Sequence, residues 1–271
     1  MMMSMHRAAA LLLAVGLSLI PAGPLAAQID YRNLDRERPV ATEDAYPVER
    51  HAFELMLPLR SERERNGDRL HLIPLEIEYG VFDNAQIGLG LPLAALERPE
   101  LDTEWGVAGL SLFGLYNVNT ESPGLPAVSL GADLGFPVGS LAGDHVGFTL
   151  RGIATRSWGL TRLHLNAARS FGSDRDQSVA PAPRWSAGLA ADRTFFRRSL
   201  LLVGEVVIRR IAGGAPVEVN AAIGARCQLG PTLVLDGSVA RRLRADAGPD
   251  YDLTVGLSHA FGLAWLMPGR P

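Results

Sequence analysis

The sequence predicts an all-β fold, a transmembrane antiparallel up-and-down β-barrel of about twelve strands that follows a cleaved N-terminal signal peptide. Three observations lead to this prediction. Apolar side chains alternate with small or charged ones along most of the chain. The alternating segments have the length of a bilayer-crossing strand, and the connections between them alternate between short and long. Tilted strands of about 9–11 residues span a bilayer, and membrane barrels join them by short turns at one end and longer loops at the other.

Charge and composition exclude several classes of protein. The 271 residues carry a formal net charge of −3 without a basic cluster, which argues against nucleic acid as a partner. Residues 1–27 begin with a short segment that carries Arg7, continue with an apolar run and end in small residues. This is the pattern of a removable export signal. No later segment has the ~18 consecutive apolar residues of a membrane helix. Cys227 is the single cysteine, so no internal disulfide can form. Export excludes a cytoplasmic enzyme and leaves a periplasmic, secreted or outer-membrane protein of a Gram-negative cell.

The first part of the mature chain differs from the rest. Residues 28–49 are polar and charged and show no period. Two hypotheses account for them. The segment enters the barrel as a plug, with Thr42, Glu43 and Asp44 contacting lumen arginines, or it remains a disordered periplasmic tether.

The barrel is expected over residues 50–265, followed by a C-terminal tail at 266–271. Alternation with a period of two puts successive side chains on opposite faces of each strand. Residues 104–117 carry large apolar side chains on both faces, and residues 144–170 allow more than one division into strands. In chain order, the expected strands are residues 50–60, 69–79, 84–94, 104–117, 126–137, 144–156, 158–170, 183–193, 196–210, 216–228, 231–243 and 250–261.

The two faces of these strands differ in chemistry. The apolar faces include Phe53, Leu55 and Leu57; Ile87, Leu89 and Leu91; Val128, Leu130 and Leu134; Val217, Val219 and Ile223; Leu233, Leu235 and Val239; and Tyr251, Leu253 and Val255. The opposite faces carry small or charged residues such as Glu54, Gly88, Asp133, Glu218, Asp236 and Asp252. One face therefore suits hydrocarbon and the other suits a lumen.

The connections alternate in length. Tight links follow the second, eighth and tenth strands, whereas longer polar links follow the first, third, seventh, ninth and eleventh. Outer-membrane barrels have this asymmetry, with the short turns on the periplasmic side. The link at 117–125 is an exception, because it is long where a short turn is expected.

A soluble β-sandwich would also alternate, with its charged face in water. The glycine-rich inward face and the aromatic Phe261 at the end of the last strand favour a barrel in lipid instead. In hydrocarbon every backbone polar group must be paired, so the sheet is expected to close. Twelve strands lie between the eight of a filled barrel and the sixteen of a porin, which predicts a narrow or a plugged lumen.

Several segments resemble one known family. They are residues 38–50 leading into Phe53-Glu54-Leu55, residues 79–84 leading into Ile87-Gly88, residues 202–206, and residues 250–261. The likeness covers most of residues 38–261. In these segments the chain resembles the outer-membrane family named for phenol meta-pathway degradation, whose members are also described as transporters. It is distantly similar to the long-chain fatty-acid channels. The resemblance implies a barrel that passes apolar or aromatic small molecules.

The chain departs from that family by continuing past Phe261, whereas such proteins usually stop at the aromatic. Leu263 and Trp265 keep the parity of Phe261. The last strand is therefore expected to extend to Trp265, which would be the aromatic residue of the periplasmic girdle.

Charged side chains on the inward parity are the candidate site residues. Their functional interpretation is a lining that sets selectivity or contacts the solute. The alternative is a structural network in which arginines and carboxylates pair with one another. The lumen-lining candidates are Glu54, Glu76, Glu78, Asp133, Arg151, Arg162, His164, Glu205, Arg209, Glu218, Arg226, Asp236 and Arg242.

No catalytic, metal-binding or cofactor-binding residue is predicted. Two alternatives to a channel remain: a closed structural barrel that acts through its extracellular loops, and, less favoured, a lipid hydrolase that uses His145 or His164. The expected partners are outer-membrane lipid, a small apolar solute, and the barrel-assembly machinery, which would bind the last strand near Phe261.

Overall fold

The computed structural model describes residues 29–172, 178–196, 199–212, 215–244 and 248–266. The expected signal peptide at 1–27 and most of the expected tail, residues 267–271, lie outside the described residues. Among the described residues, no helix is both long and apolar enough to cross a membrane.

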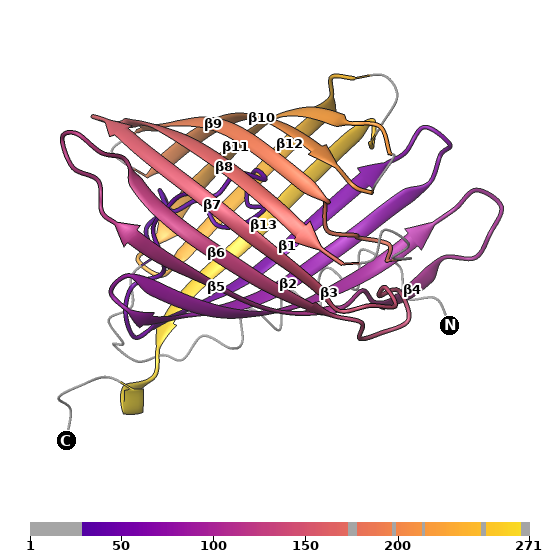
Figure 1. Cartoon of the computed structure of the whole chain (residues 1–271), viewed down its shortest axis with the longest axis horizontal. Helices are drawn as coiled ribbons and strands as arrows, with labels where there is room; N and C mark the ends of the chain where they lie inside the picture. The colour runs from indigo at the N-terminus through magenta and orange to yellow at the C-terminus, as the bar shows by residue number, and fades with distance from the viewer. Residues whose placement is uncertain (1–28, 173–177, 197–198, 213–214, 245–247, 267–271) are drawn as a thin grey trace.

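A single antiparallel sheet dominates the described part of the chain and closes on itself (Figure 1). Its strands are β1 (Ala52–Arg63), β2 (Arg69–Phe82), β3 (Ala85–Glu97), β4 (Glu104–Val107), β5 (Leu110–Asn119), β6 (Ala127–Phe136), β7 (Gly147–Trp158), β8 (Thr161–Phe171), β9 (Trp185–Phe195), β10 (Leu200–Arg210), β11 (Glu218–Gly230), β12 (Leu233–Arg242) and β13 (Tyr251–Gly262). The first strand pairs with the last, from Ala52 opposite Gly262 to Arg63 opposite Tyr251. This pairing closes the barrel, as the sequence predicted.

The strand expected at 104–117 is interrupted. β5 pairs with β3 up to Gly90, and β4 pairs with β3 from Leu93 onward, so the two short strands share one position in a barrel of twelve strands. Two residues account for the break. Pro92 has no N–H to donate, and Gly109 has a φ of 135°, which extended strands do not adopt.

The last strand also differs from the expectation. β13 ends at Gly262, and a single 3₁₀ turn, η1 (Ala264–Leu266), follows it. The expected extension to Trp265 is therefore wrong. Its physical reason is that Gly262 already pairs with Ala52, the first residue of β1, so a longer strand has no partner on that side.

The two faces of the strands follow the predicted parity. On β11, Ile223 is exposed on the outside, whereas Arg226 is buried inside the barrel. On β5, where both faces are apolar, Phe113 and Leu115 point inward and Leu112 and Tyr116 outward. Residues 144–170 divide into β7 and β8, joined by the tight turn at 159–160.

The long link between β5 and β6 forms a small hairpin at the end of the barrel that carries the short turns. An isolated bridge joins Ser122 to Leu125, and Arg156 of β7 donates hydrogen bonds to the carbonyls of Pro123 and Leu125 at 2.8 Å. Glu121 accepts the Ser157 N–H at 2.8 Å and lies 3.5 Å from the Arg156 Nε. These contacts fix a turn that its length alone would leave loose.

Glu121 makes this turn sensitive to acid. Burial acts to raise the pKa of its carboxyl, but the Ser157 hydrogen bonds and the Arg156 charge outweigh burial and lower the pKa below its ordinary 4.5. A lowered pKa in the folded state stabilises the fold above the unfolded-state pKa, and this contribution disappears as the pH falls through the folded-state pKa. When the pH is lowered below about 4.5, we expect the urea concentration at the unfolding midpoint to decrease less in Glu121→Gln than in the wild type. Equal pH dependence of the two proteins in urea unfolding would contradict this assignment.

Candidate functional site

The chain before β1 lies inside the barrel. We call residues 29–51 the inner segment; it appears in indigo within the strands of Figure 1. The Ile29 N–H donates to the carbonyl of Pro231 at the β11–β12 turn, and the His51 N–H donates to Gly80 near the β2–β3 turn, at 2.8 Å. Both ends of the segment are therefore at the short-turn end, which is the periplasmic end of a membrane barrel.

The base of the inner segment is apolar and packs against the wall. Because these side chains are removed from water, they hold the segment without directional bonds. The buried cluster consists of Ile29, Tyr31, Leu34, Val40 and Val48 from the segment and Ala52, Ala190, Leu201, Val203, Ala222, Val234 and Ala260 from the strands.

Two arginines are completely enclosed where the inner segment meets β11 to β13. Arg226 of β11 donates to Asp35 of the segment at 2.7 Å. Arg38 of the segment donates to Asp236 of β12, and to Ser258 of β13 at 2.6 Å. In one pair the wall supplies the arginine and the segment the carboxylate, and in the other pair the roles are reversed. Each buried arginine is thus matched by a carboxylate.

A second group of pairs joins the inner segment to β2, β6 and β7. Arg36 of the segment donates to both Asp133 of β6 and Glu76 of β2. Arg151 of β7 donates to Asp133 at 2.8 Å and also to Glu43 of the segment. The Arg36 guanidinium further lies 4.3 Å from the centre of the Phe113 ring.

The third group centres on Arg162 of β8. Its guanidinium donates to Asp44 of the segment at 2.8 Å and to Asp192 of β9 at 2.6 Å. His164 is fully buried beneath this pair, with its Nε2 3.0 Å from Asp192 and its Nδ1 3.0 Å from the Thr155 hydroxyl. Both ring nitrogens are engaged and no face of the ring reaches solvent, so this histidine positions the network.

The backbone of the inner segment is paired partly within the segment, as where the Asp44 N–H donates to the Leu34 carbonyl, and partly with wall side chains. Glu205 accepts the N–H groups of Ala41 and Thr42 at 2.9 and 2.8 Å. Asn166 exchanges two hydrogen bonds with the main chain of Glu43. Further along, Thr155, Asn117 and Ser129 bind the main chain of Ala45, and Gln86 accepts the N–H of Val48.

The structure places all the lumen-lining candidates on the inner face but does not bring them to one point. The candidates that bind the inner segment directly are Glu76, Asp133, Arg151, Arg162, Glu205, Arg226 and Asp236. Arg209 pairs with Glu218 at 2.7 Å and Arg242 pairs with Asp250, both nearer the long-loop end. Glu54 and Glu78 are buried opposite each other on β1 and β2.

Within the segment, Glu43 and Asp44 contact lumen arginines, whereas Thr42 contributes its N–H to a carboxylate. Asp192 is the main wall residue that sequence reasoning missed. It has the inward parity of β9, but it lies at the edge of the strand expected at 183–193. The uncharged partners Asn166 and Gln86 also have inward parity, which is the only signal that could have found them.

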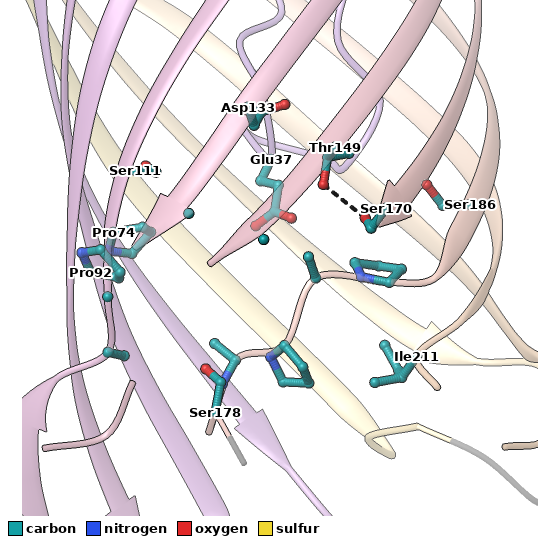
Figure 2. A pocket seen from close by; sticks show the side chains of 18 of the residues that line it. Glu37, Pro74, Pro92, Ser111, Asp133, Thr149, Ser170, Ser178, Ser186 and Ile211 are labelled. Carbon is teal, nitrogen blue, oxygen red and sulfur yellow. Dashed lines mark hydrogen bonds between the residues drawn. The ribbon is translucent and has the colours of Figure 1, made fainter. Parts of the chain in front are cut away.

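A cavity of about 710 Å³ lies above the inner segment, on the long-loop side. Its floor includes Glu37 and Thr42, and Figure 2 shows Glu37 directed into the cavity between Pro74 and Pro92 on one wall and Ser186 on the other. The Glu37 side chain is 56% exposed and lies 3.3 Å from Arg60.

One side of the cavity is apolar and continues into the loops. Leu72 of β2 packs with Ala94, Ala108 and Leu141, and Val179 of the β8–β9 loop joins them. The Val179 N–H donates to the carbonyl of Leu141 at 3.3 Å, which joins residue 179 to the connection between β6 and β7. A cavity of this volume and mixed lining matches the sites that hold small organic molecules.

The described residues form no group of metal-binding side chains. His145, the other histidine considered for hydrolysis, lines the cavity.

No protein-family model matches the chain, and no curated protein matches it. Among solved structures, an outer-membrane channel from Pseudomonas putida F1 superposes with a TM-score of 0.60 at 15% identity, over 84% of this chain and 100% of that chain. A KdgM porin superposes with a TM-score of 0.50 at 13% identity, over 76% of this chain and 99% of that chain, and the porin is also known in complex with disordered oligogalacturonate. At these identities the similarity establishes the fold, a β-barrel of the outer-membrane type.

Proposed function

We propose that this chain is an outer-membrane channel for small apolar or aromatic solutes, with the inner segment as its gate. The observation that carries the proposal is the cavity above the segment, which is open to the long-loop end and closed below by charged contacts. The resemblance to phenol meta-pathway transporters supports the solute class, and the apolar wall around Leu72 and Val179 suits such a solute.

In this mechanism a solute enters from outside and rests against the apolar wall, above Glu37. Passage requires the inner segment to leave the lumen, because its apolar base is packed inside the barrel against wall residues such as Leu201 and Val234. The segment is attached to the barrel at His51 alone and is otherwise held by non-covalent contacts, so it can swing as one piece toward the periplasm.

A disulfide lock tests the gate in the full mature chain. Gly188 and Thr42 suit it, because a Cβ built on Gly188 lies 3.8 Å from the Thr42 Cβ, close to the mean Cβ separation of about 3.8 Å in natural disulfides. In a Cys227→Ala background, Thr42→Cys/Gly188→Cys should conduct poorly in planar bilayers when oxidised and at least about threefold better after reduction.

The matched control is Cys227→Ala with Thr42 and Gly188 retained, whose conductance should not respond to reductant. Equal conductance of the oxidised and reduced double-cysteine protein would count against the gate. Conductance in neither state, from protein shown to be folded by its heat-modifiable gel mobility, would leave the closed structural barrel as the better account.

Solute preference is tested separately in proteoliposomes by osmotic swelling. Phenyl glucoside and methyl glucoside differ in the aromatic ring and cross a bilayer slowly. We expect the reduced double-cysteine protein to admit phenyl glucoside at least about threefold faster. A faster rate for methyl glucoside would contradict the proposed solute class while leaving the gate intact.

A further inference from the structure

A row of cations crosses the outer face of the barrel near its long-loop end. Arg69 of β2 is directly opposite Arg63 of β1, Arg63 is opposite Tyr251 of β13, and Tyr251 is opposite Arg241 of β12. Residues in register on neighbouring strands share a face, and neighbouring strands are about 4.8 Å apart. The inward neighbours Glu62 and Leu70 line the cavity, so the row itself faces away from the lumen.

The row is unusual because three positive charges lie in register with a single carboxylate, Glu97, beside them. Like charges directly opposite each other destabilise a strand pair. Among the described residues, Arg63 and Arg241 have no ion-pair partner, and Arg69 has only Glu97 at 3.9 Å. The Arg241 guanidinium lies 5.7 Å from the centre of the Tyr251 ring, which leaves its N–H groups free for another acceptor. An anion bound from outside would offset this repulsion.

The height of the row identifies the anion. Two residues further into β12 and β13, the outward residues Val239 and Leu253 are about half exposed and begin the apolar band, whereas β1 and β2 carry Ser61 and His71 at that level. The row therefore lies at the margin of that band, beside an aromatic of the kind found at membrane interfaces. Lipid headgroups occupy this level, and Arg binds phosphate through paired N–H groups better than Lys does. All 26 basic residues of the chain are arginine.

The same pattern recurs once on the other side of the barrel. Trp185 of β9 lies opposite Arg169 of β8 and opposite Arg210 of β10, again at the long-loop ends of the strands. Between these two patches, by contrast, β6 and β7 end in the outward aromatics Phe136 and Phe148. The cations are thus confined to particular strands and do not form a continuous ring.

We propose that the row Arg69–Arg63–Tyr251–Arg241 binds the phosphate groups of a phosphorylated lipid in the outer leaflet. The lipid's acyl chains would lie along Leu253 and Val239 while its phosphates bridge the guanidinium groups. The proposal concerns the outer surface and stands whether or not the barrel conducts.

Native mass spectrometry of the mature protein in a neutral detergent tests this site. The probes are bisphosphorylated lipid A, its dephosphorylated counterpart and inorganic phosphate. We expect wild-type protein to prefer the phosphorylated lipid, and Arg63→Gln/Arg241→Gln to bind it about tenfold more weakly or worse. Both residues are exposed, so the substitutions should leave the barrel folded, and heat-modifiable gel mobility checks the fold.

The matched control removes the same number of charges elsewhere. Arg98→Gln/Arg193→Gln takes one arginine from the β3–β4 loop and one that lies over Phe195 at the periplasmic end. This control should bind the phosphorylated lipid as the wild type does. The proposal is overturned if Arg63→Gln/Arg241→Gln binds unchanged, if the dephosphorylated lipid binds equally well, or if millimolar inorganic phosphate displaces the lipid, which would indicate a site for free anions.

Discussion

Replacing Arg162 by Met is expected to lower the free energy of unfolding by about 3–5 kcal/mol, because it leaves two buried carboxylates without their cation. Asp44 and Asp192 have fully enclosed side chains, and Arg162 is only 4% exposed. The loss should also loosen the inner segment, because Asp44 is one of its anchors. Urea unfolding followed by tryptophan fluorescence measures the first effect, and trypsin cleavage after Arg32 and Arg36 measures the second.

Arg169→Met is the matched control on the same strand. Arg169 is exposed on the outer face of β8, so the same substitution there should change stability by no more than about 0.5 kcal/mol. If Arg162→Met unfolds at the wild-type urea concentration and resists trypsin equally, the network around Arg162 contributes little and the segment is held by its apolar base.

Gly80→Ala is expected to be the second most damaging change, at about 1–3 kcal/mol. A Cβ at Gly80 would lie 2.1 Å from the Glu49 carbonyl oxygen and 2.7 Å from that of Val48. Both are backbone atoms, so no side chain can rotate to make room. The junction between the inner segment and β1 must shift instead, which should reduce protection of the segment from trypsin.

The control for this change is Gly152→Ala in β7, where an added Cβ has nothing within 4 Å. Alanine there should be neutral or slightly stabilising, because it restricts the unfolded chain. A loss of stability at residue 152 equal to that at residue 80 would indicate a general intolerance of strand glycines to substitution and would remove the special role assigned to Gly80.

The barrel could be predicted from the sequence because its two solvents differ. Lipid outside selects residues such as Ile223 and the lumen selects residues such as Arg226, so parity alone assigns each side chain to a face. The break at Ala108–Gly109 could not be predicted, because it depends on Pro92 of the neighbouring strand as well as on Gly109 itself. The alternation of side chains within one strand does not show that a residue of the neighbouring strand lacks an N–H group.

The contacts of the inner segment were less predictable. Parity identified Arg162 and Asp236 as inward, but it could not pair them with Asp44 and Arg38, which are far away in sequence and have no period. Asp192 was missed for a related reason. Its role comes from the cross-strand position opposite Arg162, and the strand that carries it could be bounded only approximately.

The signs of the charges in the inner segment also determine which forces can move it. Its six carboxylates and four guanidinium groups leave a net charge of −2, so an electric field across the membrane pulls on most of its charges in opposite directions. Added salt screens exposed charges far more than enclosed ones such as Arg226 and Asp35. Ionic strength is therefore a weak trigger, and an electric field acts on only two uncompensated charges. In the proposed mechanism, the stimulus that opens the barrel acts at contact distance, as a solute resting against Glu37 and the floor of the cavity would.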